Sequence, residues 1–132
     1  MKRRNISSGT SWETTVGYSR AVRVGSLIEV AGTTAVDERG EVVGPDDPYL
    51  QAKYALEKIG RALAEAGAGL ESVIRTRMFV TDMARWEEVG RGHGEVFRDI
   101  RPAATLVQVA SLVRPDLLVE IEATAVVPED AP

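Results

Sequence analysis

One amphipathic segment constrains the fold of this 132-residue chain more than any other feature of its sequence. Asp47 followed by Pro48 is typical of a helix start, because aspartate caps free N–H groups and proline suits the first helical position. Gly67 and Gly69 mark the end of the segment. Between these boundaries, apolar side chains recur with helical spacing: Ala52, Ala55, Leu56, Ile59, Ala62, Leu63 and Ala66. The sequence therefore predicts a helix with one apolar face, which must pack against another layer.

Runs typical of β-strands lie on both sides of this helix. Val22–Val24 and Leu27–Val30 flank Gly25-Ser26, which indicates a two-residue hairpin. Glu41–Val43 is predicted as a short return strand after a reversal at residues 37–40. The later predicted elements, in chain order, are a strand over residues 73–80, a helix that begins at Asp82 and carries apolar residues as far as Ile100, and strands over residues 104–112 and 117–127.

The predicted order is βββ-α-β-α-ββ, so the expected fold class is α+β: a single domain with a mixed sheet and both helices on one face. The other sheet face would lack a cover, although the last strand carries apolar residues on both sides, such as Leu118 and Ile121. Another subunit is the simplest cover for so short a chain. We expect residues 1–15 to be a flexible lead-in, residues 16–127 the domain and residues 128–132 a C-terminal tail.

Composition excludes several classes of function. The 16 basic and 20 acidic residues give a net charge of −4, which argues against non-specific nucleic-acid binding. The chain has no cysteine, so disulfides, thiolate metal sites and cysteine nucleophiles are excluded. His93 is the one histidine, so no site can take two histidines from one chain. No apolar run approaches the ~18–20 residues of a membrane span, and we expect a cytoplasmic protein without membrane contact.

Charged side chains alternate along two of the predicted strands. Glu120 and Glu122 share one face of the last strand, and Arg75 and Arg77 share one face of the strand after the first helix. One interpretation is a ladder of ion pairs between neighbouring strands. The other is that one carboxylate faces a cleft and positions a water molecule for acid–base chemistry. The spacing alone does not choose between them.

Three other side chains have two interpretations each. His93 is either a half-buried histidine bonded to a carbonyl or a catalytic base. Trp86 either belongs to the core or forms a substrate platform, and Tyr18 either packs at the start of a strand or offers its hydroxyl to a ligand.

Two segments near the C-terminus, residues 101–110 and Val119–Ala123, resemble the signature of the Rid (YjgF) family. These proteins are the reactive-intermediate deaminases, also labelled endoribonuclease L-PSP or translation inhibitors. Further matches follow in the family's order: Gly17–Ser19, Val30–Gly32, Phe79–Asp82 and Glu95–Phe97. The resemblance covers about residues 16–127. It implies a chorismate-mutase-like subunit in a homotrimeric barrel, with clefts for small molecules between subunits and no metal or organic cofactor.

The resemblance also implies a site for hydrolysing an imine or enamine to a carbonyl compound and ammonia. Tyr18 would line the cleft, and Gly32 would offer its backbone carbonyl. Thr105 and the backbone N–H of Leu106 would lie beside the carboxylate of the substrate. Glu120 would position or deprotonate the attacking water.

Three pocket positions depart from the deaminases: a serine is replaced by Ala31, an asparagine by Gly90, and the third departure matters most. The arginine that follows their Pro-Ala dipeptide, and that binds the carboxylate of a 2-imino acid, is Ala104 here. A guanidinium fork cannot be replaced by alanine, so standard 2-imino acid deamination is not expected. Arg75, Arg77 or Arg101 could replace it only by facing the same cleft, of which Trp86 would be a further wall. The alternatives are a trimer that binds a ligand or partner without turnover and, less favoured by the acidic charge, an endoribonuclease.

Overall fold

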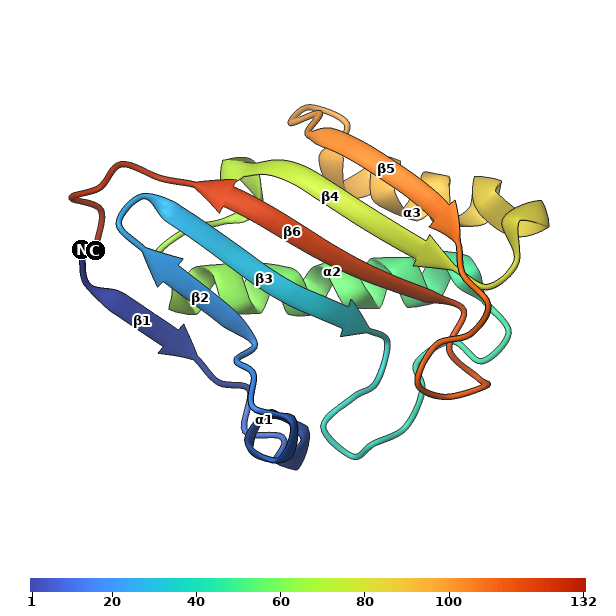
Figure 1. Ribbon diagram of the computed structural model, residues 1–132. Coiled ribbons are helices and arrows are strands. Elements are labelled where there is room, and N and C mark those ends of the chain that lie inside the picture. Colours follow the sequence, from blue (N-terminus) through green and yellow to red (C-terminus); the bar gives the residue numbers. More distant parts are fainter.

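A six-stranded mixed sheet in the order β1-β2-β3-β6-β4-β5 forms the frame of the structure, a computed structural model that describes residues 1–132 (Figure 1). The strands are β1 (Arg3–Ile6), β2 (Ala21–Val24), β3 (Leu27–Thr34), β4 (Val73–Val80), β5 (Ala103–Gln108) and β6 (Val119–Val126). The helices are α1 (Ser11–Val16), α2 (Pro48–Glu65) and α3 (Trp86–Phe97), with short 3-10 turns η1 (Leu70–Ser72) and η2 (Met83–Arg85). Only β4 and β5 are parallel; the other neighbours are antiparallel. Helices α2 and α3 cover the same face of the sheet, which confirms the predicted α+β architecture (Figure 1).

Helix α2 forms as its boundaries predict. The side chain of Asp47 accepts a hydrogen bond from the N–H of Leu50 at 3.0 Å, and Pro48 is the first helical residue. Gly67, with φ of 88°, reverses the chain just after the helix. All the predicted apolar positions of α2 are buried and belong to the core beneath β3 and β6. None of the helices combines the length and apolarity that a membrane span requires.

The first three strands are not the three that were predicted. The β2–β3 hairpin is confirmed, but Glu41–Val43 forms no strand and contributes only an isolated bridge between Val36 and Val42. The third strand is β1, which pairs with β2 and places Ile6 in the core. It lies in the segment expected to be a flexible lead-in, and so does α1 except for its last residue, Val16. Since β1 is mostly exposed and carries one core side chain, its sequence has no apolar alternation to reveal it.

Later boundaries also differ from the predictions. Asp82 does not begin the long helix: its side chain accepts a hydrogen bond from the N–H of Ala84 at 3.0 Å and caps η2, after which α3 starts at Trp86. Helix α3 ends at Phe97, before Ile100. The strand predicted over residues 104–112 ends at Gln108 as β5.

An irregularity in β3 determines which of its side chains face the core. Ile28 and Val30 are buried, whereas beyond them Thr33 and Ala35 are the buried residues. The pairing register of β3 with β6 shifts between Val30 and Thr33. This β-bulge reverses the alternation and changes the direction of the backbone over residues 31–32.

A buried glutamine ties α2 to two loops. The Gln51 side chain is fully buried, and its Nε2 donates to the carbonyls of Gly44 at 3.2 Å and Asp116 at 3.1 Å. Its Oε1 accepts from the N–H of Leu118 at 2.8 Å. One amide therefore satisfies three backbone groups that meet beside the start of β6.

Replacing this amide by an apolar side chain is expected to destabilise the fold. Gln51→Leu leaves buried backbone groups without partners, so the free energy of unfolding should fall by about 2–4 kcal/mol in urea denaturation. Gln108→Leu is the control, because Gln108 is exposed; it should cost less than about 1 kcal/mol. Equal losses in the two variants would contradict this role for Gln51.

Candidate functional site

A cavity of about 530 Å³ lies where β3 and β6 meet the loops that follow α1 and β3. Tyr18 and Arg20, from the segment before β2, form part of its wall. Gly32 on β3 and Glu120 on β6 form another part. The structure therefore brings together three of the predicted site residues, Tyr18, Gly32 and Glu120, within one chain.

The Glu120 carboxylate lies against the backbone of Gly32. On β6, Val119 and Ile121 are buried toward the helices, so Glu120 faces the opposite side of the sheet. A Cβ atom on Gly32 would overlap Glu120 Oε2, so a side chain at this position would have to displace the carboxylate. The carboxylate makes no hydrogen bond or ion pair. Burial raises the pKa of Glu120, the positive charge of Arg20 opposes this effect, and the nearby Glu122 adds to it.

Arg20 is the site residue that the sequence analysis missed. Its Nη2 donates to the carbonyl of Gly32 at 2.6 Å, and its guanidinium carbon lies 5.7 Å from the centre of the Tyr18 ring. Its Nε is buried and has no hydrogen-bond partner. The one available signal was its position directly after the Gly17–Ser19 segment, and nothing local distinguishes it from a solvent-exposed arginine at the start of a strand.

A lysine from the helical layer completes the wall of the cavity. Lys58 Nζ donates to the carbonyls of Thr34 and Val36, each at 2.8 Å. Burial, reinforced by the charges of Arg20 and Arg61, lowers the pKa of Lys58 to about 8. Both of its hydrogen bonds hold the end of β3 in place.

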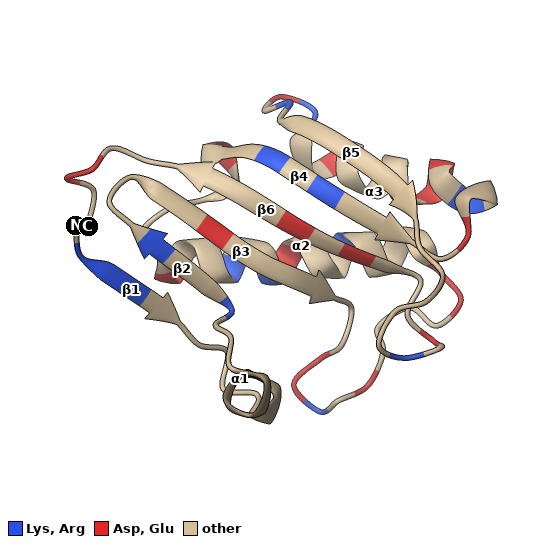
Figure 2. Ribbon diagram, viewed as in Figure 1, with Lys and Arg blue, Asp and Glu red and all other residues tan.

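Of the two interpretations of the alternating charges, the ion-pair ladder applies to Glu122 and the carboxylate that faces a cleft is Glu120. Figure 2 shows acidic positions on β6 beside basic positions on β4. Arg77 and Glu122 form an ion pair at 3.5 Å, as the ladder predicts. Arg75 instead donates to Thr105 Oγ1 at 2.6 Å. Glu120 has no such partner and faces the cavity, so it is the carboxylate available for chemistry.

The other predicted site residues lie away from this cavity. Ala104, Thr105 and Leu106 are on β5, the edge strand at the far end of the sheet from β1. Ala104 pairs with the buried Thr76 on the helical side, whereas Thr105 shares the open face with the arginines of β4. Trp86, 53% exposed, begins α3. Within one chain none of these four residues lines the cavity that holds Glu120.

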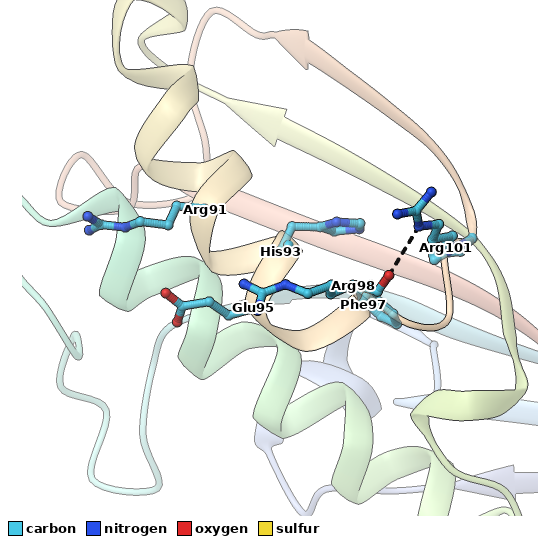
Figure 3. Close-up of a pocket in the computed structure, with 8 residues that line it drawn as sticks. Arg91, His93, Glu95, Phe97, Arg98 and Arg101 are labelled. Atoms are coloured by element: carbon cyan, nitrogen blue, oxygen red, sulfur yellow. Dashed lines mark hydrogen bonds between the residues drawn. The ribbon is translucent and has the colours of Figure 1, made fainter.

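His93 has a hydroxyl partner rather than the expected carbonyl. Its Nε2 is 2.8 Å from Thr76 Oγ1, its ring centre lies 4.7 Å from that of Phe97, and burial lowers its pKa. A second hollow of about 380 Å³ adjoins it and includes Arg91 and Arg101 (Figure 3). These two arginines point toward opposite ends of the hollow (Figure 3). Within one chain Arg101 therefore lies in a different hollow from Glu120.

The family model described as Endoribonuclease L-PSP matches residues 9–127 of the chain. The 3-aminoacrylate deaminase RutC of Acinetobacter baylyi is 34% identical over 108 residues, which cover 82% of this chain and 85% of that protein.

Solved structures show the same fold. The crystal structure of Rv2704 from Mycobacterium tuberculosis, a member of the YjgF/YER057c/UK114 family, has a TM-score of 0.87 and 49% identity, covering 96% of this chain and all of that one. The structure of TdcF from E. coli with bound serine has a TM-score of 0.78 and 26% identity, covering 94% of each chain.

The raised pKa of Glu120 predicts a dependence of stability on pH. Because its folded-state pKa lies above the ordinary value of 4.5, the native state holds the proton more tightly than the unfolded chain, and stability falls as pH rises through this range. Glu120→Gln removes this cost, so thermal unfolding at pH 7 should occur at a higher temperature than in the wild type. The difference should shrink below pH 4.5.

Glu122→Gln is the matched control, since Glu122 lies on the same strand face but is paired with Arg77. It should not stabilise the protein at pH 7. A loss of stability in Glu120→Gln at pH 7 would show that the Glu120 carboxylate has stabilising partners in solution.

Proposed function

Because this chain belongs to the endoribonuclease L-PSP family, which the YjgF and RutC proteins share, we propose that it binds a small imine or enamine and hydrolyses it to a carbonyl compound and ammonia. The observation that carries the proposal is the Glu120 carboxylate, which is partly buried in a cavity, unpaired and raised in pKa. These are the properties of a carboxylate that can act as a general base toward water. A relative at 34% identity is named a 3-aminoacrylate deaminase, which supports this class of reaction.

The proposed reaction needs one water molecule and one carboxylate. Glu120 accepts a proton from water as the oxygen adds to the carbon of the C=N bond. The Glu120 carboxyl then returns this proton to the nitrogen of the tetrahedral intermediate. The hydroxyl proton then passes through Glu120 to the nitrogen, the C–N bond breaks as the carbonyl forms, and ammonia leaves. An enamine first tautomerises to the imine: a proton adds to its carbon and its nitrogen loses one.

A neighbouring copy of the chain would complete the cleft. None of the four residues Ala104, Thr105, Leu106 and Trp86 lines the cavity of Glu120 within one chain, and in this proposal they come from another subunit. The open face of the sheet also carries exposed apolar side chains, such as Leu27, Val107 and Val126. In the proposed homotrimer, the open faces pack toward one another and remove these side chains from water.

Release of ammonia tests the activity. Freshly generated 2-iminopropanoate, 2-iminobutanoate and 3-aminoacrylate are the substrates, and Glu120→Gln should lower the rate at least about 100-fold because it removes the base. Glu122→Gln should retain most of the wild-type rate. An absence of ammonia release from all three compounds would contradict an enzymatic role and leave the binding of a ligand as the function.

Replacing Ala104 tests whether the missing guanidinium limits the substrate range. Ala104→Arg restores a fork for the carboxylate of a 2-imino acid, and turnover of 2-iminopropanoate should rise about tenfold or more relative to the wild type. An unchanged rate would show that residue 104 does not face the substrate in the assembly.

The assembly has its own test. Light scattering should give a mass of about 43 kDa, three times the 14.3 kDa of the chain. A species of 14.3 kDa that remains active would contradict the proposal that residues of a second copy complete the cleft.

A further inference from the structure

The carbonyl that the resemblance reserves for a substrate already accepts one hydrogen bond from the protein. Gly32 O accepts a hydrogen bond from Arg20 Nη2 at 2.6 Å, a short contact for an N–H donor. The guanidinium thus presents N–H donors where an acceptor was expected. A ligand group at this end of the cavity would meet hydrogen-bond donors and a positive charge.

Arg20 is also the cation of the cavity with the most unused donors. The structure gives its side chain one hydrogen bond, although a guanidinium carries five N–H groups. Arg114, another lining residue, donates through Nε and Nη2 to both carboxylate oxygens of Asp116 and through Nη1 to Gly40 O. Lys58 is held by two backbone carbonyls. The protein therefore uses most of the hydrogen-bond donors of Arg114 and Lys58, whereas most donors of Arg20 remain for a ligand.

The position of Arg20 relative to Glu120 suits a small acid. Both side chains contact Gly32, one through its carbonyl and the other at its Cα, yet they do not pair with each other. Both line the same cavity. An anionic group bound to Arg20 would neutralise its charge, and a carbon two or three bonds from that group could then lie beside Glu120.

We propose that Arg20 is the anion-binding residue of this site. It takes over the role of the arginine that the deaminases carry at the position of Ala104. It does so from the same chain as Glu120 rather than from a neighbour. The substrate class is a small carboxylic acid whose carboxylate binds the Arg20 guanidinium while its imine or enamine carbon lies beside Glu120. This inference rests on the proposed function for the reaction, but the binding of the anion can be tested without turnover.

The test compares an acid with its neutral amide in wild type, Arg20→Gln and Arg20→Lys. With 3-aminoacrylate as substrate, Arg20→Gln should raise KM about tenfold or more, because a charge-assisted fork is lost. With 3-aminoacrylamide, KM should change less than about twofold. Arg20→Lys keeps the charge without the fork, so its KM for 3-aminoacrylate should lie between the values of the wild type and Arg20→Gln. Arg39→Gln is the control: it removes the same charge from an exposed position, where Arg39 pairs with Glu41, and should leave both KM values unchanged.

A second measurement separates this inference from the proposed function. Propanoate and propanamide are titrated into each variant and followed by NMR, with the assembly mass and unfolding temperature measured alongside. Wild type should prefer propanoate, and Arg20→Gln should lose this preference even if no ammonia is ever released. If Arg20→Gln does not fold, Arg20→Lys is the test variant. Its preference for propanoate over propanamide should then be smaller than that of the wild type. Equal weakening of acid and amide would overturn the inference and assign Arg20 to positioning Gly32 alone.

Discussion

The pairing of β3 with β6 is the constraint on which the candidate site depends. These strands lie at the centre of the sheet, and the bulge at residues 31–32 shifts their register by one residue. The shift turns Gly32 so that its Cα meets the Glu120 carboxylate and its carbonyl meets Arg20. Any side chain at residue 32 would displace the carboxylate. One backbone irregularity thus fixes the Glu120 carboxylate and the Arg20 guanidinium relative to each other.

Two neighbouring glutamates on the same sheet face have different partners. Glu122 lies opposite Arg77 in the β4–β6 register and pairs with it, whereas Glu120 lies opposite Phe79 and has no cation across the strand. The difference is one of register rather than of residue type. Burial without a partner raises the pKa of Glu120, and a carboxyl in that state can accept and return a proton during hydrolysis. Residue identity alone would have assigned both glutamates the same role.

The arginine that is absent at residue 104 can be replaced by an arginine elsewhere in the chain. Ala104 lies on β5, two strands from β6, and pairs with Thr76 on the helical side, whereas Glu120 faces the open side of the sheet. Arg20 lies within the cavity wall of the same chain and already contacts Gly32. An anchor held by the same backbone that positions the carboxylate needs no precise subunit contact. The relocation would change the orientation of the bound acid, and with it the set of acids that fit.

Most of the architecture was determined by the sequence, because helix caps, the α2 stripe and β-branched runs act over a few neighbouring residues. Asp47, Pro48 and Gly67 gave the helix boundaries, and the motifs near Glu120 gave the family. Local sequence patterns did not predict strand β1, because it is stabilised by backbone pairing with β2. They did not predict the contact of Arg20 either, because it forms only where the bulge brings Gly32 O to the guanidinium. Side-chain type sets which chemistry is available, and only the tertiary register decides which of two like charges lies unpaired beside a cavity.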